Sequence, residues 1–380
     1  MNLLVLTLAA VALQFSDALP QIIPLRNYNN ETISTILTAE PGGNLYLASN
    51  DPAYMLQKIQ LITGSVTINL DQLLDGTYVS IADNLRIKSG NDAPSTALLS
   101  GFLYVTTAVQ ANDKNFFVTV VNGATPLSRN GPKSTTVVLN TQTKDDFPPF
   151  DDPGKTTYVT QIQQQSTSNM NFHYGVPNDD YDVRTSNQFF ENPMILKNYA
   201  KNGQNLPDTR AFFTNIEPLQ INVPYWHITS NGSYNMTLDS RYMDVHVRDT
   251  TAETTTGVIV VTDVLMDQVV NFKVDPTRQG RCGILSSNFL DFPVNLYLFK
   301  SDGGTTTGGF AGSQLHSLFE SDFAPSKLEV NSSALIPGEL YMQYFVISKR
   351  GPSPDSTHNC STFHDDGIVY NHYEYCPHHY

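Results

Sequence analysis

The sequence predicts an all-β fold, with one or two jelly-roll-like β-sandwich domains, a loop-rich middle segment and a short C-terminal tail. Three observations carry this prediction. Short runs of β-branched and aromatic residues alternate with polar residues at a period of two, as in residues 58–70. Asp75-Gly76 and Asn122-Gly123 separate such runs, and these dipeptides favour hairpin turns. Gly and Pro punctuate the chain throughout, so long helices are not expected.

The strands expected in the first half are bounded by these turn signals. They cover residues 58–62, 65–70, 77–81, 102–106, 116–120 and 135–139. An acidic, proline-rich stretch follows at residues 144–154. Pro148-Pro149 cannot lie inside a central strand, so this stretch is predicted to be an exposed linker.

The middle segment has weaker signals. Residues 187–201 are the best helix candidate, although Pro193 interrupts them. The strands expected beyond them cover residues 221–223, 226–229, 234–238, 243–247, 258–262, 269–274, 294–299 and 341–348. The predicted organisation is a signal peptide at 1–18, a β-sandwich domain at 19–140, a linker at 141–156, a second β-rich domain at 157–350 and a His-rich tail at 351–380.

Composition excludes several classes of protein. The chain has 380 residues, with 22 Lys and Arg against 36 Asp and Glu, which gives a net charge of −14. Such an acidic chain lacks the positive charge that binds nucleic acid phosphates, so no nucleic acid partner is expected. The 19 Tyr and 20 Phe supply enough apolar surface to exclude a wholly disordered chain.

The N-terminus has the pattern of a secretory signal peptide. Residues 3–15 are almost entirely apolar, and the small residues Ser16 and Ala18 precede the expected cleavage site. This run is shorter than the roughly 20 residues that a membrane-spanning helix needs. Later apolar runs are only a few residues long, so the sequence predicts a secreted protein with no membrane span.

Acceptor motifs for N-glycosylation support export. They begin at Asn30, Asn231, Asn235, Asn331 and Asn359. Each is followed by Ser or Thr two residues later, and an exported chain passes the enzyme that modifies such asparagines.

The three cysteines cannot form a disulfide scaffold. Cys360 and Cys376 are expected to pair, because an oxidising compartment favours a disulfide and the loop of about 16 residues would stabilise the fold by about 3 kcal/mol. The alternatives for this tail are a metal site, given its many histidines, and an ordinary surface tail. Cys282 is then the odd cysteine, and the alternatives for it are burial or a disulfide with one of the tail cysteines.

No sequence motif of catalysis, nucleotide binding or metal binding is present. The chain lacks His-Glu-x-x-His, Gly-x-Ser-x-Gly and a phosphate-binding loop, so no cofactor or catalytic residue is assigned. Acidic clusters at 145–152 and 178–182 lack the spacing of calcium loops and are interpreted as solvated. Trp226 is interpreted as core packing, with a sugar-stacking platform as the alternative.

One stretch resembles a known family. Residues 71–85, with Leu74-Asp75-Gly76-Thr77-Tyr78-Val79 at their centre, are similar to a segment of nematode secreted CUB-like proteins. The resemblance covers residues 45–121, and residues 257–348 are a candidate second copy, with chance similarity between strands as the alternative. It implies a CUB-like β-sandwich, no catalytic site and a link to responses to microbes at secretory epithelia.

These observations predict a secreted, N-glycosylated, non-enzymatic β-sandwich protein that binds an extracellular ligand, either a glycan or a protein surface. A role in innate immune or epithelial defence follows from the resemblance. Two alternatives remain open. One is a secreted hydrolase acting on glycans, since paired carboxylates have no fixed sequence spacing. The other is a structural protein of the extracellular matrix or surface coat.

Overall fold

The computed structural model describes residues 20–28, 34–90, 99–141, 155–177, 187–196, 209–242, 246–261, 267–273, 279–286, 294–301, 303–310, 317–321, 323, 325–332, 340–349, 364–365 and 368–370. Strands dominate these residues, which confirms the prediction of an all-β fold. The helices are the short α2 (Ala53–Leu56) and α3 (Ala108–Asn112), with 3-10 turns η1 (Leu25–Tyr28) and η2 (Leu70–Leu73).

The first of two compact units comprises the described residues up to Phe116 together with Pro177. Its two antiparallel sheets have four strands each. Sheet A contains, in spatial order, β1 (Gln21–Pro24), β8 (Phe102–Val105), β3 (Asn44–Ala48) and β6 (Tyr78–Ser80). Sheet B contains β2 (Ser34–Leu37), β7 (Leu85–Ser89), β4 (Ile59–Thr63) and β5 (Val66–Asn69).

The two sheets of the first unit form a β-sandwich. Leu45 and Leu47 of β3 face the same buried core as Leu61 of β4 and Ile87 of β7. Alternate residues of β4 and β7 are buried, as expected for strands with one face on a core.

The second unit contains four sheets. Sheet C has the order β14 (Gln188–Asn192), β13 (Met170–Tyr174), β18 (Tyr225–Ser230), β11 (Ser134–Asn140) and β9 (Phe116–Val121). Sheet D has eight strands, in the order β10 (Thr125–Arg129), β19 (Tyr234–Tyr242), β12 (Lys155–Gln164), β17 (Leu219–Ile221), β21 (Thr255–Val261), β28 (Leu340–Lys349), β23 (Gln279–Ser286) and β26 (Ser317–Ser321).

The two remaining sheets of this unit have four and five strands. Sheet E has the order β15 (Met194–Leu196), β16 (Thr209–Phe213), β30 (Ile368–Tyr370) and β29 (His364–Asp365). Sheet F has the order β20 (Val247–Asp249), β22 (Gln268–Asn271), β27 (Lys327–Ser332), β24 (Val294–Phe299) and β25 (Thr305–Phe310). Part of the predicted tail thus contributes β30, which pairs with β16, and β29, which pairs with β30.

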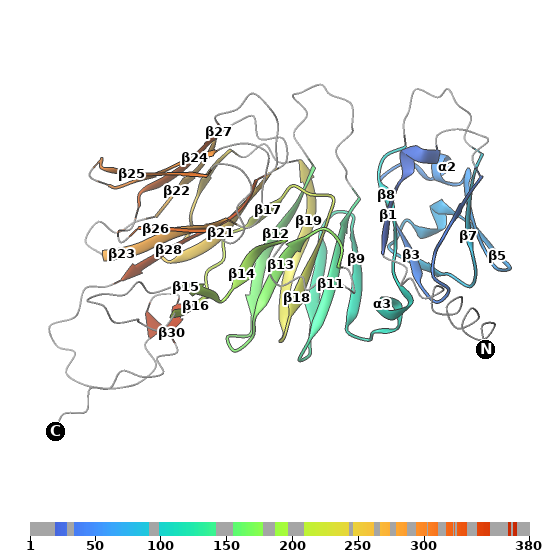
Figure 1. The fold of residues 1–380 in the computed structure, drawn as a ribbon, viewed down its shortest axis with the longest axis horizontal. Helices are drawn as coiled ribbons and strands as arrows, with labels where there is room; N and C mark the ends of the chain where they lie inside the picture. The colour runs from blue at the N-terminus through green and yellow to red at the C-terminus, as the bar shows by residue number, and fades with distance from the viewer. Residues whose placement is uncertain are drawn as a thin grey trace, which may run out of the picture. The chain divides into compact units, whose positions relative to one another are not determined.

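Sheet D is the middle layer of the second unit (Figure 1). Its part from β10 to β21 shares a core with sheet C, in which Val159 and Leu238 pack with Trp226. Its part around β23 and β28 shares another core with sheet F, in which Ile284 packs with Leu296. On β21, Val260 faces the first core and Ile259 the second. Strands covered on both faces are buried almost continuously, as β21 and β28 are.

The helix candidate at residues 187–201 is wrong. Its described residues form β14 and β15 on either side of Pro193, and residues 197–201 lie outside the described part of the chain. Proline lacks the backbone N–H that a helix interior requires. The two strands instead gain cross-strand partners, since β14 pairs with β13 and β15 with β16.

The change from the first unit to the second comes after Phe116, earlier than the sequence boundary at residue 140. β11 pairs with β18 and β10 pairs with β19, so both belong with strands from the later part of the chain. Residues 142–154 of the predicted linker lie outside the described residues, between β11 and β12 of this same unit.

Candidate functional site

One side of sheet D near β19 carries an exposed polar surface. On β19, Met236 and Leu238 point into the core, so the alternate residues point to the opposite side. We name the outward side chains of β12 and β19 the β19 face. The β19 face comprises Tyr158, Thr160, Gln161, Gln163, Asn235, Thr237, Asp239 and Arg241.

A β-bulge in β12 arranges the amides of this face. The register with β19 shifts between Thr160 and Gln163, and Gln161 has a positive φ of 54°. The extra residue lets Ile162 pack on the core while Gln161 and Gln163 remain exposed. Gln161 Oε1 then accepts a hydrogen bond from Thr237 Oγ1 at 3.0 Å. The bulge therefore places the Gln161 amide of β12 beside the Thr237 hydroxyl of β19.

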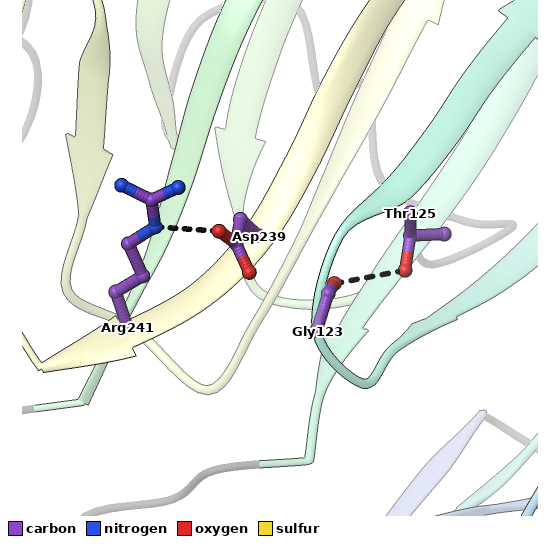
Figure 2. Close-up of polar contacts among 4 residues, drawn as sticks. All are labelled: Gly123, Thr125, Asp239 and Arg241. Carbon is purple, nitrogen blue, oxygen red and sulfur yellow. Dashed lines mark hydrogen bonds and ion pairs between the residues drawn. The ribbon is translucent and has the colours of Figure 1, made fainter.

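Arg241 is the most chemically distinctive residue of the β19 face. Its Nε donates to Asp239 Oδ2, as Figure 2 shows, and its guanidinium lies 5.1 Å from the centre of the Tyr158 ring. The Arg241 side chain is 57% exposed, whereas that of Asp239 is 17% exposed. Its two terminal nitrogens have no hydrogen-bond partner among the described residues, so they can donate to an acceptor from outside.

The turn between β9 and β10 lies at the edge of sheet D beside this face. Thr125 Oγ1 donates to the carbonyl oxygen of Gly123 at 3.1 Å (Figure 2). Gly123 has a φ of 74°, which glycine adopts without steric cost. Pro126 fits in β10 because an edge strand has one unpaired side.

Arg129 of β10 connects sheet D to sheet C by hydrogen bonds at the same edge. Its Nη2 donates to Thr119 Oγ1 at 3.1 Å, and its Nε donates to Thr136 Oγ1 at 3.1 Å. Its guanidinium lies 4.3 Å from the centre of the Phe117 ring, and burial lowers its pKa. Arg129 therefore has a structural role, unlike Arg241.

Buried polar residues elsewhere in sheet D are held by structural partners. Gln343 of β28 is 0% exposed. Its Oε1 accepts from the backbone nitrogen of Glu191 at 2.8 Å, and its Nε2 donates to the Glu191 carbonyl oxygen at 2.9 Å and to Thr256 Oγ1 at 3.0 Å. This side chain therefore joins β14 of sheet C to the centre of sheet D.

A second buried polar group lies around Glu217, which is 3% exposed. Its carboxylate accepts from the backbone nitrogen of Thr251 at 2.9 Å and from Thr255 Oγ1 at 2.8 Å. Arg248 of sheet F donates to Gln220 Oε1 of sheet D at 3.4 Å, and burial lowers the pKa of Arg248. These groups connect sheet F to sheet D.

Two histidines stack on neighbouring strands of sheet C. The rings of His173 and His227 lie 4.8 Å apart and 13° from parallel. His227 Nδ1 donates to the carbonyl oxygen of Gly175 at 2.9 Å, while its buried Nε2 has no hydrogen-bond partner among the described residues. Burial lowers the pKa of His227 to about 4, so the ring is neutral at physiological pH.

The predicted glycosylation sites fall in different settings. Asn231 is exposed in the turn between β18 and β19, and Asn235 is exposed on the β19 face. Asn331 is half-buried on β27. Asn30 and Asn359 lie outside the described residues, so modification of the five asparagines stays a prediction.

The other residues singled out from the sequence are mostly structural or undescribed. Trp226 is 0% exposed and packs against Phe172 with ring centres 5.0 Å apart, as the core interpretation expects. Cys282 is 1% exposed in the core between sheets D and F. Cys360, Cys376, residues 1–18 and the acidic clusters at 145–152 and 178–182 lie outside the described residues. Among the residues that are described, no three His, Cys, Asp or Glu side chains gather to hold a metal ion.

The sequence interpretation missed Tyr158, Asp239 and Arg241. The strand predicted at residues 234–238 ended before Asp239, whereas β19 continues to Tyr242. Extending the period-two pattern would have placed Asp239 and Arg241 on one side, because strand residues two apart face the same way. The contribution of Tyr158 depends on the pairing of β12 with β19, which the sequence does not reveal.

The comparisons with known proteins identify a family. Residues 40–368 match the family model described as "Glycoprotein: Transmembrane glycoprotein". This match corrects the prediction of a protein with no membrane span, because the family is one of transmembrane glycoproteins. In the described residues, no helix has the length and apolar character that crossing a membrane requires.

Neither of the other two comparisons adds to this result. No curated protein matches the chain. Among solved structures, the insecticidal delta-endotoxin Cry8Ea1 from Bacillus thuringiensis aligns with 86% of this chain at 8% identity and a TM-score of 0.19. The alignment spans 55% of the toxin chain, and a likeness of this degree carries no argument about function.

Proposed function

Because the chain belongs to the transmembrane glycoprotein family, we propose that it is an extracellular, N-glycosylated binding protein that recognises a glycan through the β19 face and catalyses no reaction. The observation that carries this proposal is Arg241, whose terminal nitrogens are exposed donors held over Tyr158 and beside Asp239. The signal-peptide pattern of residues 1–18 supports an extracellular location.

The ligand class follows from the groups on the β19 face. A guanidinium has a fixed, planar set of donors and stacks on aromatic rings, so its donor directions are set before a ligand arrives. Tyr158 and Asp239 hold it in this way. Gln161 and Gln163 add exposed amides on the same side of the sheet. Hydroxyl-rich or acidic sugars offer the acceptors that such donors need.

The buried ionisable residues support a non-catalytic role. Glu217 accepts hydrogen bonds from Thr251 and Thr255, and the Nδ1 of His227 donates to Gly175. General acid–base catalysis needs such groups within reach of a substrate. These side chains are buried instead among the strands that they connect.

The resemblance of residues 71–85 to nematode CUB-like proteins adds a biological setting to this proposal. Together, the resemblance and the hydrogen-bond donors of the β19 face favour recognition of microbial surface glycans at an epithelium. Binding to bacterial and to fungal cells tests this setting, because the two kinds of surface differ in their sugars.

The test is a binding screen of the purified, glycosylated protein on a glycan array and on whole bacterial and fungal cells. Released sugar products are assayed in the same samples. We expect saturable binding without product release, and at least a tenfold weaker affinity for Arg241→Ala, because an exposed Arg that anchors a ligand is commonly worth more than about 1.4 kcal/mol.

Arg86→Ala is the matched control. Arg86 is also an exposed arginine on a strand, but it lies in β7 of the first unit. Its replacement should leave affinity unchanged. Two outcomes would contradict the proposal. If products are released and the release disappears when a single carboxylate is replaced, the protein is an enzyme. If wild type and Arg241→Ala bind with equal affinity, the β19 face is not the recognition surface.

A further inference from the structure

The outward side of sheet F places a glycan acceptor beside an aromatic ring. On β24 and β27 the Leu and Val residues point into the core, so the alternate residues point outward. We name these outward side chains the β27 face. It comprises Asn295, Tyr297, Phe299, Lys327, Glu329 and Asn331.

The register of the two strands fixes the neighbours of Asn331. Asn331 lies directly opposite Asn295, and Tyr297 lies opposite Glu329. Tyr297 is therefore the diagonal neighbour of Asn331 on the same side of the sheet. Diagonal neighbours are about 7–8 Å apart, which aromatic and long side chains can bridge.

The polar contacts of this face leave Tyr297 as its available ring. Lys327 Nζ lies 4.0 Å from the centre of the Phe299 ring and 2.6 Å from Glu329 Oε1. Phe299 is thus covered by a cation that Glu329 also holds. The centre of the half-exposed Tyr297 ring lies 6.5 Å from that of the Phe299 ring, and among the described residues no cation lies over it.

Asn331 itself has an unsatisfied atom. Its Oδ1 is buried and has no hydrogen-bond partner among the described residues. Native structures satisfy nearly all such atoms, so each exception calls for a missing partner.

We infer that Asn331 carries an N-linked glycan whose first sugars pack on Tyr297 and cover the β27 face. The apolar side of a pyranose ring consists of C–H groups, which pack favourably on an aromatic face. The match to a glycoprotein family supports glycosylation of this chain, and the placement of the glycan on Tyr297 is the new element. This glycan stabilises sheet F, whereas it takes no part in ligand recognition by the β19 face.

The acceptor asparagines near β19 differ from Asn331. Asn235 Nδ2 donates to Gln163 Oε1 at 3.2 Å, and its neighbours on β10 and β12 are Ser128 and Gln163. Asn231 lies in a turn, where its Oδ1 accepts from the backbone nitrogen of Asn169 at 2.6 Å. Asn235 has no aromatic residue among its opposite or diagonal neighbours on β10 and β12, and Asn231 lies outside the strands, so glycans there would extend into solvent.

The test uses four forms of the protein made in cells that add N-glycans. They are the wild type, Ser333→Ala, Tyr297→Thr and the double variant. Ser333→Ala removes the acceptor motif and keeps Asn331. Threonine removes the ring of Tyr297 but keeps a β-branched residue suited to a strand. Mass spectrometry gives site occupancy, and thermal unfolding gives the midpoint.

We expect an occupied Asn331 and a midpoint about 2–4 °C lower for Ser333→Ala than for the wild type. The same change should have no effect when Tyr297 is already threonine. Ser233→Ala, which removes the Asn231 motif, is the matched control and should leave the midpoint unchanged. An unmodified Asn331, or an equal loss in both Tyr297 backgrounds, would overturn the inference.

A second readout needs no change at Tyr297. Hydroxyl-radical labelling of the Tyr297 peptide should increase about twofold or more in Ser333→Ala, because removal of the glycan exposes the ring. Labelling of the Tyr54 peptide serves as the internal reference, since Tyr54 is 62% exposed in the first unit. Equal labelling of Tyr297 with and without the glycan would contradict the packing.

Discussion

The second unit contains two sets of hydrogen-bonding side chains. One set is buried between sheets, and the other is exposed on the β19 face. Gln343, between sheets C and D, uses both its amide oxygen and its amide nitrogen on Glu191. Arg241, on the β19 face, uses one nitrogen on Asp239 and leaves two exposed. Polar groups between sheets therefore fix the fold, whereas those on the β19 face keep donors for a ligand.

The largest expected effect tests the buried set through pH. In the folded chain the pKa of His227 is about 4, against an ordinary 6.5. Between these values the unfolded chain binds a proton that the folded chain does not, so stability is complete above pH 6.5 and falls as pH drops to about 4. The loss should reach about 3 kcal/mol.

The measurement is urea unfolding at pH 7, 5.5 and 4, followed by the fluorescence of Trp226. This single tryptophan lies in the core of sheets C and D and reports on the second unit. The His227→Gln variant keeps an amide donor for the Gly175 carbonyl oxygen. Its free energy of unfolding should fall by about 3 kcal/mol less than that of the wild type between pH 7 and pH 4. An unchanged slope in this variant would assign the acid sensitivity to other groups.

The next effect comes from Gln343. Gln343→Leu keeps the size of the side chain but leaves the Glu191 backbone groups and the Thr256 hydroxyl without their partner. We expect about 2 kcal/mol of lost stability, because buried polar groups without hydrogen bonds cost about 1–3 kcal/mol. Gln163→Leu on the β19 face is the matched change and should alter stability by less than about 0.5 kcal/mol. Equal losses would erase the contrast between the two sets.

A smaller effect is expected at the edge of sheets C and D. Arg129→Met keeps much of the side chain's apolar stem but removes its bonds to Thr119 and Thr136 and its contact with Phe117. The expected loss is about 1 kcal/mol by the same fluorescence-detected unfolding. A loss close to zero would place Arg129 with the exposed arginines instead.

The sequence predicted the parts of the fold that depend on local pattern. Residues 58–62 and 102–106 alternate or run apolar as strands, and the structure contains β4 and β8 there. Trp226 was interpreted as core and is buried. These predictions succeed because period-two burial and turn chemistry are properties of neighbouring residues.

The remainder depends on which strands pair, and neighbouring residues do not encode that. The helix candidate at 187–201 failed because β14 and β15 gain their bonds from β13 and β16. The β19 face was missed because Tyr158 and Asp239, 81 positions apart by their numbers, meet only through strand register. Side chains on one surface of a sheet come from distant segments, so a site of this kind cannot be found from spacing alone.

The most direct test of the account compares stability and binding in the same two variants. The variants are Arg241→Ala and Gln343→Leu, and the ligand is the best binder from the glycan array. We predict that Arg241→Ala weakens binding at least tenfold with less than about 0.5 kcal/mol lost in stability, since Arg241 is largely exposed. Gln343→Leu should lose about 2 kcal/mol yet bind normally while folded. Normal binding by Arg241→Ala would contradict the account.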